Sequence, residues 1–391
     1  MIMEKQRILI VHNYYQIPGG EDTVVENEKK LLEEQGHFVV LYSRNNLEIK
    51  EMNIVKKIFL PYASIFNFRT YWEIKKLIRE KRIDIVHVHN TLSLISPSVY
   101  YAARVCSIPV IQTVHNFRLL CPGAMFYRDG HICEDCVKLG LRCAVKYNCY
   151  RKSKIQTLIC VINSKIHRMI GIYGEINYIC LTAFNKEKLL SIKQIKGDRV
   201  FVKPNFTRKK LIFIPKNKRK NQFIFAGRLD ITKGIDILFE SWKNMGLGAP
   251  KLIVCGKGPM EKWCKDFVNN NKVNIELKGF VSNLEIQELL AVSKALVLPT
   301  LLFEGFPMSI VEAYSVGTPV VASDQGNVGS IVIEGKTGSK FNLEIDNSIN
   351  VAIKRLDDYK DIYTSTIEEY EKKYSQTSNY NELIKIYSLV K

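Results

Sequence analysis

The segment from Glu304 to Glu312 (EGFPMSIVE) places one carboxylate before a glycine–proline turn and a second one after it. An apolar run that ends at Pro299 precedes this segment. A helical pattern begins near Ser309, a suitable N-cap, and stops at Gly317. Glu304 is therefore expected on a loop at the carboxyl end of a strand, and Glu312 in the early turns of a helix.

Backbone amides around Gly305, Phe306 and Pro307, together with the start of that helix, can face an anionic or hydroxyl-rich ligand. The spacing of the two glutamates is uninformative by itself, because Glu26 and Glu34 have the same spacing. The pair indicates a binding site because it lies between an expected strand, a turn and an expected helix. The alternative is a loop carboxylate beside a carboxylate that only complements a helix dipole.

A second group of residues can hold phosphate. Arg228 and Lys233 lie in a strand-to-helix turn (GRLDITKG), where a planar guanidinium fork and a compact ammonium can clamp a diphosphate. Gly19 and Gly20 follow the first expected strand, and glycine lets the backbone approach a phosphate or sugar closely. Such glycine pairs are most often simple turns.

The pair Gly256 and Gly258 is a poor dinucleotide fingerprint, since the third glycine and the acidic residue at the expected distance are missing.

The cysteines suggest separate chemistry. Cys121, Cys133, Cys136 and Cys149 contain a C-x2-C core with two outlying thiols, and Cys143 is a substitute ligand. Four thiolates suit a tetrahedral, structural Zn²⁺. The alternative is a set of reduced thiols without metal. No catalytic cofactor is expected.

Short β-branched runs alternate with amphipathic helical patterns in both halves of the chain, which indicates βαβ units and parallel sheets. A region rich in cysteine, glycine and aromatic residues, 121–149, interrupts the first half as an inserted loop, and a lysine-rich linker covers 207–221. Two such domains in tandem would bind ligands at the carboxyl ends of their strands. The expected strands are 7–12, 38–42, 83–89, 109–115 and 178–182, then 222–226, 251–255, 275–278, 295–299 and 318–323.

The 391 residues carry a net charge of +18, and this charge is uneven. Residues 1–220 hold 38 Lys and Arg against 18 Asp and Glu, a net +20, while the remainder holds 19 against 21, a net −2. Residues 138–174 contain eight basic and no acidic residues. This asymmetry favours a polyanionic partner, nucleic acid or an anionic membrane; the alternative is a solvated basic face.

Other function classes are disfavoured. The hydrophobic fraction of 46% is that of a globular protein. The N-terminus has no apolar core typical of a signal peptide, and the chain has no run of 18 apolar residues. An intracellular protein with reduced thiols is therefore expected.

Taken together, these motifs resemble the retaining, nucleotide-sugar-dependent glycosyltransferases of family 4 (group 1), which have the GT-B fold of two Rossmann-like domains facing across a cleft. The resemblance covers nearly the whole chain. The matching positions are the Glu304…Glu312 segment, Gly227-Arg228…Lys233-Gly234, Gly19-Gly20, Pro204-Asn205 and His115.

The resemblance assigns roles in nucleotide binding. Arg228 and Lys233 would hold the diphosphate, Glu312 would bind the ribose hydroxyls, and the backbone around Val281 would meet the base. Gly19, Gly20, Gly305, Phe306 and Pro307 complete the implied donor site.

It also assigns the chemistry. Glu304 would contact the transferred sugar and favour its developing positive charge, and His115 would lie near the donor sugar. Retention would follow from front-face attack, with the leaving phosphate as base. An Asp-x-Asp triplet is missing, in agreement with a family that needs no catalytic metal. His87 and His89 alternate with apolar residues and are assigned to structure.

The resulting expectation is an acceptor-binding domain over 1–203 plus about 374–391, with the insertion 121–149, and a nucleotide-sugar domain over 204–373. The donor would be a UDP-sugar and the acceptor a glycan or polyprenyl-linked lipid in bacterial polysaccharide synthesis. Attachment to the cytoplasmic face of the inner membrane would centre on residues 138–168. The rivals are a GT-B sugar-nucleotide epimerase, a nucleic-acid-binding protein and an inactive scaffold; no nucleic-acid module is recognisable.

Overall fold

A computed structural model describes residues 5–16, 19–208 and 213–391. They divide into two compact units. The first takes in the described residues of Met1–Met125, Cys133–Lys203 and Tyr380–Lys391, and the second those of Phe126–Ile132 and Pro204–Asn379. Most of the last helix of the chain thus belongs to the first unit, and seven residues of the insertion group with the second.

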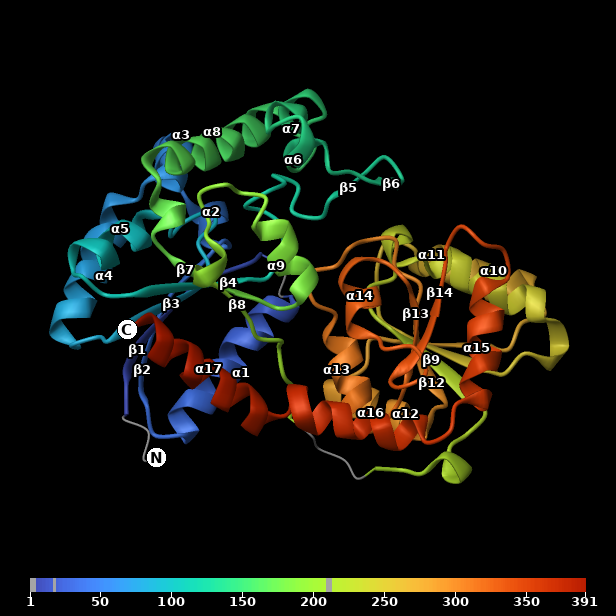
Figure 1. Ribbon diagram of the computed structural model, residues 1–391. Coiled ribbons are helices and arrows are strands. Elements are labelled where there is room, and N and C mark those ends of the chain that lie inside the picture. Colours follow the sequence, from blue (N-terminus) through green and yellow to red (C-terminus); the bar gives the residue numbers. More distant parts are fainter. Residues whose placement is uncertain (1–4, 17–18, 209–212) are drawn as a thin grey trace. The chain divides into compact units, whose positions relative to one another are not determined.

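The first unit is built on a six-stranded parallel sheet (Figure 1). Its three central strands are buried along almost their whole length, as expected for a parallel sheet with helices on both faces. In spatial order the strands are β2 (Phe38–Asn45), β1 (Arg7–Tyr14), β3 (Ile85–Asn90), β4 (Val110–Val114), β7 (Asn177–Cys180) and β8 (Val200–Val202).

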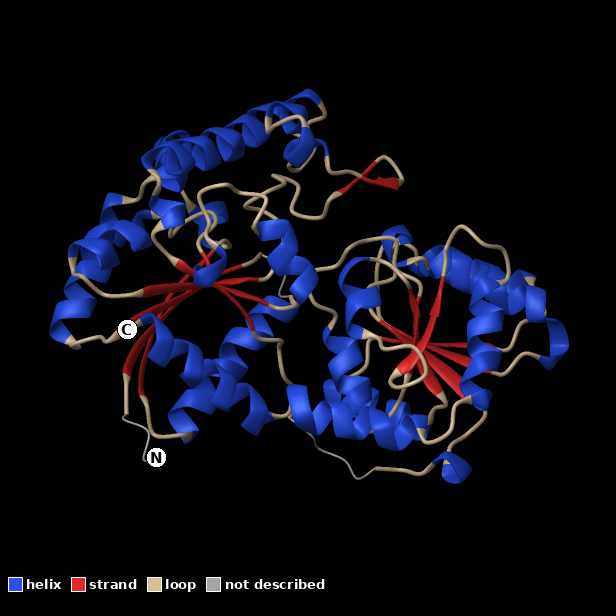
Figure 2. Cartoon of the chain, viewed as in Figure 1, coloured by secondary structure: helices blue, strands red, loops and turns tan. Residues whose placement is uncertain are grey.

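Helices separate these strands in the chain (Figure 2). They are α1 (Gly20–Glu34), α2 (Glu48–Glu51), α3 (Ile54–Ile65), α4 (Phe68–Glu80), α5 (Ser98–Val105), α8 (Lys154–Ile170) and α9 (Ala183–Leu189). The C-terminal α17 (Gln376–Val390) returns from the second unit. The insertion contains the short antiparallel strands β5 (Tyr127–Arg128) and β6 (His131–Ile132) and the short helices α6 (Asp135–Lys138) and α7 (Arg142–Lys146).

The second unit has another six-stranded parallel sheet, in the strand order 3-2-1-4-5-6 of a Rossmann fold. Its strands, in spatial order, are β11 (Ile275–Gly279), β10 (Lys251–Cys255), β9 (Gln222–Ala226), β12 (Ala295–Leu298), β13 (Val320–Ser323) and β14 (Gly338–Phe341). Its helices are α10 (Ile235–Met245), α11 (Glu261–Asn270), α12 (Asn283–Val292), α13 (Met308–Ser315), α14 (Gly326–Ile331), α15 (Ser348–Asp358) and α16 (Ile362–Glu369), followed by a π-helical turn (Tyr370–Tyr374).

Residue alternation in β9 creates two hydrophobic cores, one on each face of this sheet. Phe223 and Phe225 belong to one core, which includes Trp242 of α10, whereas Ile224 belongs to the other, which includes Tyr314 of α13. The period of two along a strand is the reason for this division.

The α/β fold with two parallel-sheet, Rossmann-like domains is confirmed. Of the expected linker, residues 209–212 lie outside the described part of the chain. In that described part, every helix falls short of the length and apolar character needed to cross a bilayer.

Candidate active site

The second sheet reverses its strand order between β9 and β12, which lie side by side. Ligands of such sheets bind outside the carboxyl ends of the strands at this reversal. The loop after β9 carries Arg228 and Lys233, and the loop after β12 carries Thr300 and Glu304. Two motifs that are about 70 residues apart in sequence therefore meet at one position.

Lys233 and Glu304 are in direct contact at this position. The Lys233 ammonium donates to both carboxylate oxygens of Glu304, at 2.6 and 2.8 Å, and the Thr300 hydroxyl donates to Oε1 at 2.7 Å. The side chain of Glu304 is 13% exposed and that of Lys233 is 29% exposed. The carboxylate is thus held in one orientation and still reaches the surface.

The backbone at Glu304 is also unusual. Its φ of 53° is in the left-handed region, which non-glycine residues rarely adopt. The Asn327 side-chain amide donates to the carbonyls of Glu304 and Gly305, at 2.7 and 2.8 Å. These bonds fix the turn, and strained residues of this kind cluster at functional sites.

Glycines allow the loops after β9, β10 and β12 to approach one another closely. A Cβ on Gly234, whose φ is 67°, would lie 2.0 Å from the Pro299 carbonyl oxygen, and a Cβ on Gly256 would lie 1.8 Å from that of Gly227. The glycine pair at 256 and 258 therefore has a packing role: it lets the loop after β10 lie against the loop after β9. This explains the pair without a dinucleotide fingerprint.

Other predicted donor residues follow strands of the same sheet: Arg228 follows β9, Val281 follows β11 and Glu312 follows β12. Arg228 is exposed, and its Nε lies 3.6 Å from Asp230 Oδ2. Glu312 is half-buried on α13, and Val281 is buried in front of α12. The expected cap at Ser309 is wrong: α13 starts at Met308, because Pro307 has the extended backbone of the N-cap.

Polar and ionisable residues of the first unit also lie near the carboxyl ends of strands β1, β3 and β4. Gly19 is the N-cap of α1, and its amide donates to Asp22 Oδ2 at 3.0 Å. The other oxygen of Asp22 lies 2.7 Å from His12 Nε2. The glycine loop is thus anchored to β1 through a buried histidine.

His115 follows β4 and contacts His89 of β3. His89 Nδ1 lies 2.9 Å from His115 Nε2, and the rings are stacked. Burial, together with the neighbouring histidines, holds the pKa of His115 well below its usual range. Burial likewise lowers the pKa of His89 to about 4. Both imidazoles are therefore neutral at neutral pH.

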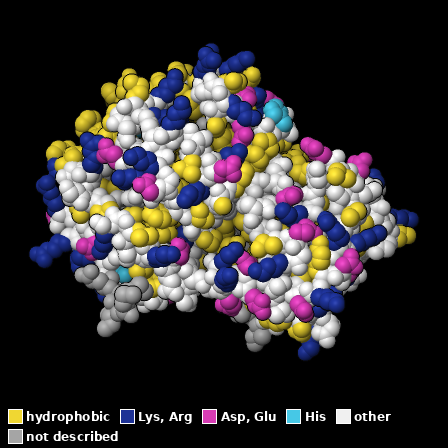
Figure 3. Space-filling view, viewed as in Figure 1, with side chains coloured by type: hydrophobic (Ala, Val, Ile, Leu, Met, Phe, Trp, Pro, Cys, Tyr) yellow, Lys and Arg dark blue, Asp and Glu magenta, His cyan; other side chains and the backbone are white. Residues whose placement is uncertain are grey.

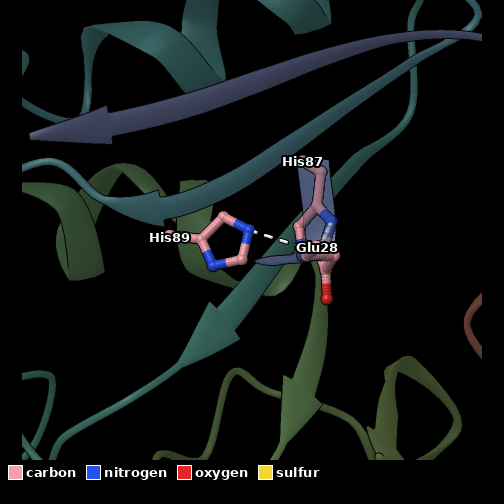
Figure 4. Close-up of side chains that lie close together, drawn as sticks. All are labelled: Glu28, His87 and His89. Atoms are coloured by element: carbon pink, nitrogen blue, oxygen red, sulfur yellow. Dashed lines mark ion pairs between the residues drawn. The ribbon is translucent and has the colours of Figure 1, made fainter. Parts of the chain in front are cut away.

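Glu28 of α1 contacts His87 and His89 of β3 (Figure 4). Glu28 Oε1 lies 3.0 Å from His87 Nδ1 and 3.3 Å from His89 Nε2, and Oε2 lies 3.0 Å from the Lys203 ammonium. Glu28 is almost fully buried. Burial raises the pKa of Glu28, but the charges of Lys203 and His87 outweigh it and hold the pKa well below its usual range.

Glu28, His87 and His89 are also the single set of three metal-ligand side chains, among the described residues, whose donor atoms all lie within 4.8 Å. A carboxylate with two imidazoles is a known zinc set. Here, however, Lys203 already supplies positive charge to Glu28. Both ring nitrogens of His87 also have partners, Tyr387 Oη and Thr113 Oγ1, each at 2.7 Å. We therefore interpret the set as a buried ion-pair network.

A cavity of about 100 Å³ lies beside His115, and its mixed polar and apolar lining includes Asn90, Asn116 and Arg118. Asn116 Nδ2 lies 3.5 Å from the Tyr15 hydroxyl, which donates to Glu21 Oε2 at 3.0 Å. Burial, with a smaller contribution from the charge of Asp22, raises the pKa of Glu21 to about 8. Glu21 is thus linked through Tyr15 to Asn116 in the cavity wall, and a carboxylate with a shifted pKa near a cavity is a candidate functional residue.

The four cysteines predicted to bind zinc are only partly brought together in the structure. Among the described residues, no three cysteine thiols lie within 4.8 Å of one another. Burial and then the nearby thiols of Cys121, Cys149 and Cys143 raise the pKa of the Cys136 thiol to about 12. The thiols are thus neighbours without forming a closed tetrahedral site, and the zinc assignment stays a prediction.

Comparison with known families decides the classification. Residues 18–131 match the model described as Glycosyltransferase Family 4, and residues 207–373 match that of Glycosyl transferases group 1. The chain is a family 4 glycosyltransferase. An uncharacterized glycosyltransferase of Methanocaldococcus jannaschii is 26% identical over 380 residues, which cover 94% of each chain.

Two further proteins are similar to this glycosyltransferase. The UDP-Gal:alpha-D-GlcNAc-diphosphoundecaprenol alpha-1,3-galactosyltransferase of Escherichia coli is 24% identical over 322 residues, which cover 78% of this chain and 76% of the relative. The crystal structure of Anabaena HepE in complex with UDP and glucose has a TM-score of 0.65 at 14% identity, and covers 98% of this chain and 99% of that one. This likeness shows the GT-B fold.

Sequence reasoning missed several residues of this glycosyltransferase's strand-end sites. Glu21, Asp22 and Glu28 have no motif of their own, because their importance depends on partners far away in the chain. The amphipathic pattern of α1 does provide one indication. Asp22 and Glu28 fall on its buried face, and a buried carboxylate needs a hydrogen-bonding or charged partner.

Proposed function

We propose that this glycosyltransferase moves a sugar from a UDP-sugar to a lipid-linked glycan acceptor, with retention of configuration at the anomeric carbon. The observation that carries the proposal is the Lys233–Glu304 pair at the strand-order reversal of the second sheet. It combines a cation for the diphosphate with a fixed carboxylate for the sugar. The relatives support the donor and setting, since one is named for UDP-Gal and an undecaprenol-linked acceptor and HepE binds UDP and glucose.

The proposed reaction breaks the bond between the anomeric carbon and the diphosphate oxygen and forms one to an acceptor hydroxyl oxygen. The hydroxyl proton passes to the leaving phosphate. Arg228 and Lys233 offset the charge that develops on the leaving diphosphate, and the Glu304 carboxylate stabilises the positive charge on the sugar ring. Glu312, in the middle of α13, would accept hydrogen bonds from the ribose hydroxyls.

The first unit would bind the acceptor. Its cavity beside His115 offers amide, imidazole and guanidinium groups, which suit sugar hydroxyls and phosphate. A lipid-linked acceptor must be met at a membrane surface, and the net +20 of residues 1–220 supports peripheral attachment to the anionic cytoplasmic face of the inner membrane.

Thermal-shift screening against UDP, GDP, ADP and their sugars tests the donor. UDP at 100 times its Kd should stabilise the protein by about 2.7 kcal/mol. NMR of the anomeric proton of the transferred sugar then tests retention. Stabilisation by GDP or ADP alone would overturn the UDP assignment, and an inverted product would overturn the stereochemistry.

An epimerase of the same fold is the rival enzyme. It would convert or release the sugar from the nucleotide sugar without any acceptor. Incubation of the donor with and without a lipid-linked glycan separates the two, because a transferase consumes the donor rapidly only when the acceptor is present.

A further inference from the structure

Helix α3 exposes almost its whole length to solvent although it is rich in large hydrophobic residues. Ile54, Val55, Ile58, Phe59 and Tyr62 are between 61% and 77% exposed. Their positions, i, i+1, i+4, i+5 and i+8, fall on one side of a helix. Ser64 is the single buried residue of α3. A helix that buries so little apolar surface needs a partner for it.

Helix α8 repeats this pattern beside α3. Ile155, Leu158, Ile162 and Met169 recur at helical spacing and are between 38% and 84% exposed, whereas Thr157 and Val161 on the other side are buried.

The two helices form one surface. Asn163 Nδ2 of α8 donates to the Ser64 carbonyl at 2.7 Å, and His167 Nε2 lies 3.0 Å from the Ile65 carbonyl. Trp72 of α4 is 60% exposed. Its ring lies 5.3 Å from that of Tyr71, which in turn lies 5.8 Å from the ring of Phe66 at the end of α3. We call the exposed hydrophobic residues of α3 and α8, together with Trp72, the apolar face.

The charged residues of α3 and α8 are all basic. Helices α3 and α8 contain Lys56, Lys57, Lys154, Lys165 and Arg168 and no acidic residue. Figure 3 shows hydrophobic and basic side chains interspersed over this part of the molecule. Apolar residues interspersed with lysine are typical of surfaces that lie in the interface of an anionic membrane.

We infer that the apolar face inserts into the headgroup region of an anionic lipid monolayer, so that α3 and α8 anchor the protein. The inference deepens the proposed function, because a lipid-linked acceptor has to be reached at such a surface. It also moves the centre of attachment from the predicted 138–168 stretch to α3 and α8 together, and adds apolar insertion to charge attraction. A second copy of the chain is a poorer occupant, because a symmetric contact would place the basic residues of both copies opposite each other.

Flotation of the full chain with vesicles of equal parts phosphatidylcholine and phosphatidylglycerol tests the inference. Ile58→Asp and Phe59→Asp should each weaken binding at least about tenfold at low salt, since each removes an inserted side chain and adds a repelled charge. Leu247→Asp is the matched control, because Leu247 is 88% exposed in the second unit. Unchanged flotation of both α3 variants would overturn the inference.

Trp72 gives a second readout that needs no mutation on α3. Lipids brominated in the acyl chains should quench its fluorescence on binding, and the quenching should disappear in Trp72→Phe, which keeps Trp242 and Trp263. Quenching that persists unchanged in Trp72→Phe would contradict insertion at this face. If instead Phe59→Asp converted a dimer to a monomer without affecting flotation, the occupant would be a second copy and the inference would be wrong.

These results separate the inference from the proposed function. Flotation requires neither donor nor acceptor, and UDP-dependent transfer can be followed with a short-chain, water-soluble acceptor. If the wild-type protein transfers sugar but does not float with the vesicles, the inference about the apolar face is wrong and the proposed function stands. If the wild-type protein floats but does not transfer sugar from a UDP-sugar, the proposed function is wrong and the inference stands.

Discussion

The ammonium of Lys233 lies 2.6 Å from Glu304 Oε1 and 2.8 Å from Oε2, so the proposed diphosphate ligand and the proposed sugar ligand are joined before either meets a substrate. The pair links the loop after β9 to the loop after β12. The carboxylate is thereby held in one orientation at the reversal of the sheet, where we propose that it faces the donor sugar; this leads to the first prediction.

Glu304→Gln keeps the shape of the side chain and removes its charge. We expect kcat to fall 10²- to 10³-fold, about 3–4 kcal/mol, with little change in UDP affinity, because the carboxylate acts mainly in the transition state. Steady-state kinetics and calorimetry measure the two quantities. The control is Glu26→Gln, an exposed position with the same spacing partner in Glu34. Wild-type transfer by Glu304→Gln would refute the assignment.

Glu312→Gln should affect binding instead. Loss of a charged hydrogen bond to the ribose should weaken UDP affinity by roughly 1.5–3 kcal/mol. Calorimetric titration with UDP provides the measurement. Glu288→Gln, an exposed glutamate on α12, should bind UDP as the wild type does. Equal affinity in the Glu312 variant would mean that the ribose is held elsewhere.

Glu28 and Lys203 form a buried pair whose partners are 175 residues apart. Removing one partner leaves the other charge buried, so Glu28→Gln and Lys203→Met should each destabilise the protein by about 3–5 kcal/mol. The double variant should cost less than the sum of the two single variants. Urea unfolding of all four proteins completes the cycle, and strict additivity would contradict a direct interaction.

Glu21 makes stability depend on pH. Its pKa is raised from 4.5 to about 8 by burial, so between these values the folded chain holds a proton that the unfolded chain releases. The free energy of unfolding should therefore fall as pH rises through this window, by at most about 1.4 kcal/mol per pH unit. Thermal melts across the window should show a flatter profile for Glu21→Gln than for the wild type or for the surface variant Glu33→Gln. Parallel profiles would argue against a protonated Glu21.

The cysteine insertion should bind one Zn²⁺ per chain on Cys121, Cys133, Cys136 and Cys149, with the four thiols moving closer together around the metal. Elemental analysis of protein purified without chelator measures the metal content. Cys133→Ser should lose both metal and stability, and Cys106→Ser, outside the insertion, should lose neither. Metal well below one equivalent together with unchanged stability of Cys133→Ser would favour reduced thiols.

The sequence by itself determined the repeating βαβ pattern, the two Rossmann-like domains and the positions of the glycine, basic and acidic motifs. These are local properties: a buried strand requires a β-branched apolar run, and a turn that approaches another backbone requires glycine. The strand and glycine signals place Arg228, Lys233 and Glu304 at strand ends without any knowledge of their partners.

Only the tertiary structure decided which of these groups touch. The pairing of Lys233 with Glu304, of Glu28 with Lys203, and of His87 with Tyr387 of the returning C-terminal helix joins residues that are 71, 175 and 300 positions apart. The order of the strands in each sheet brings these residues together. That order depends on how helices cover both faces of the sheet, which is a property of the whole domain and not of any local segment. The exposure of α3 could not be predicted from the sequence for the same reason. A helix rich in apolar residues is expected to be buried, and only the tertiary structure shows that other elements do not cover it.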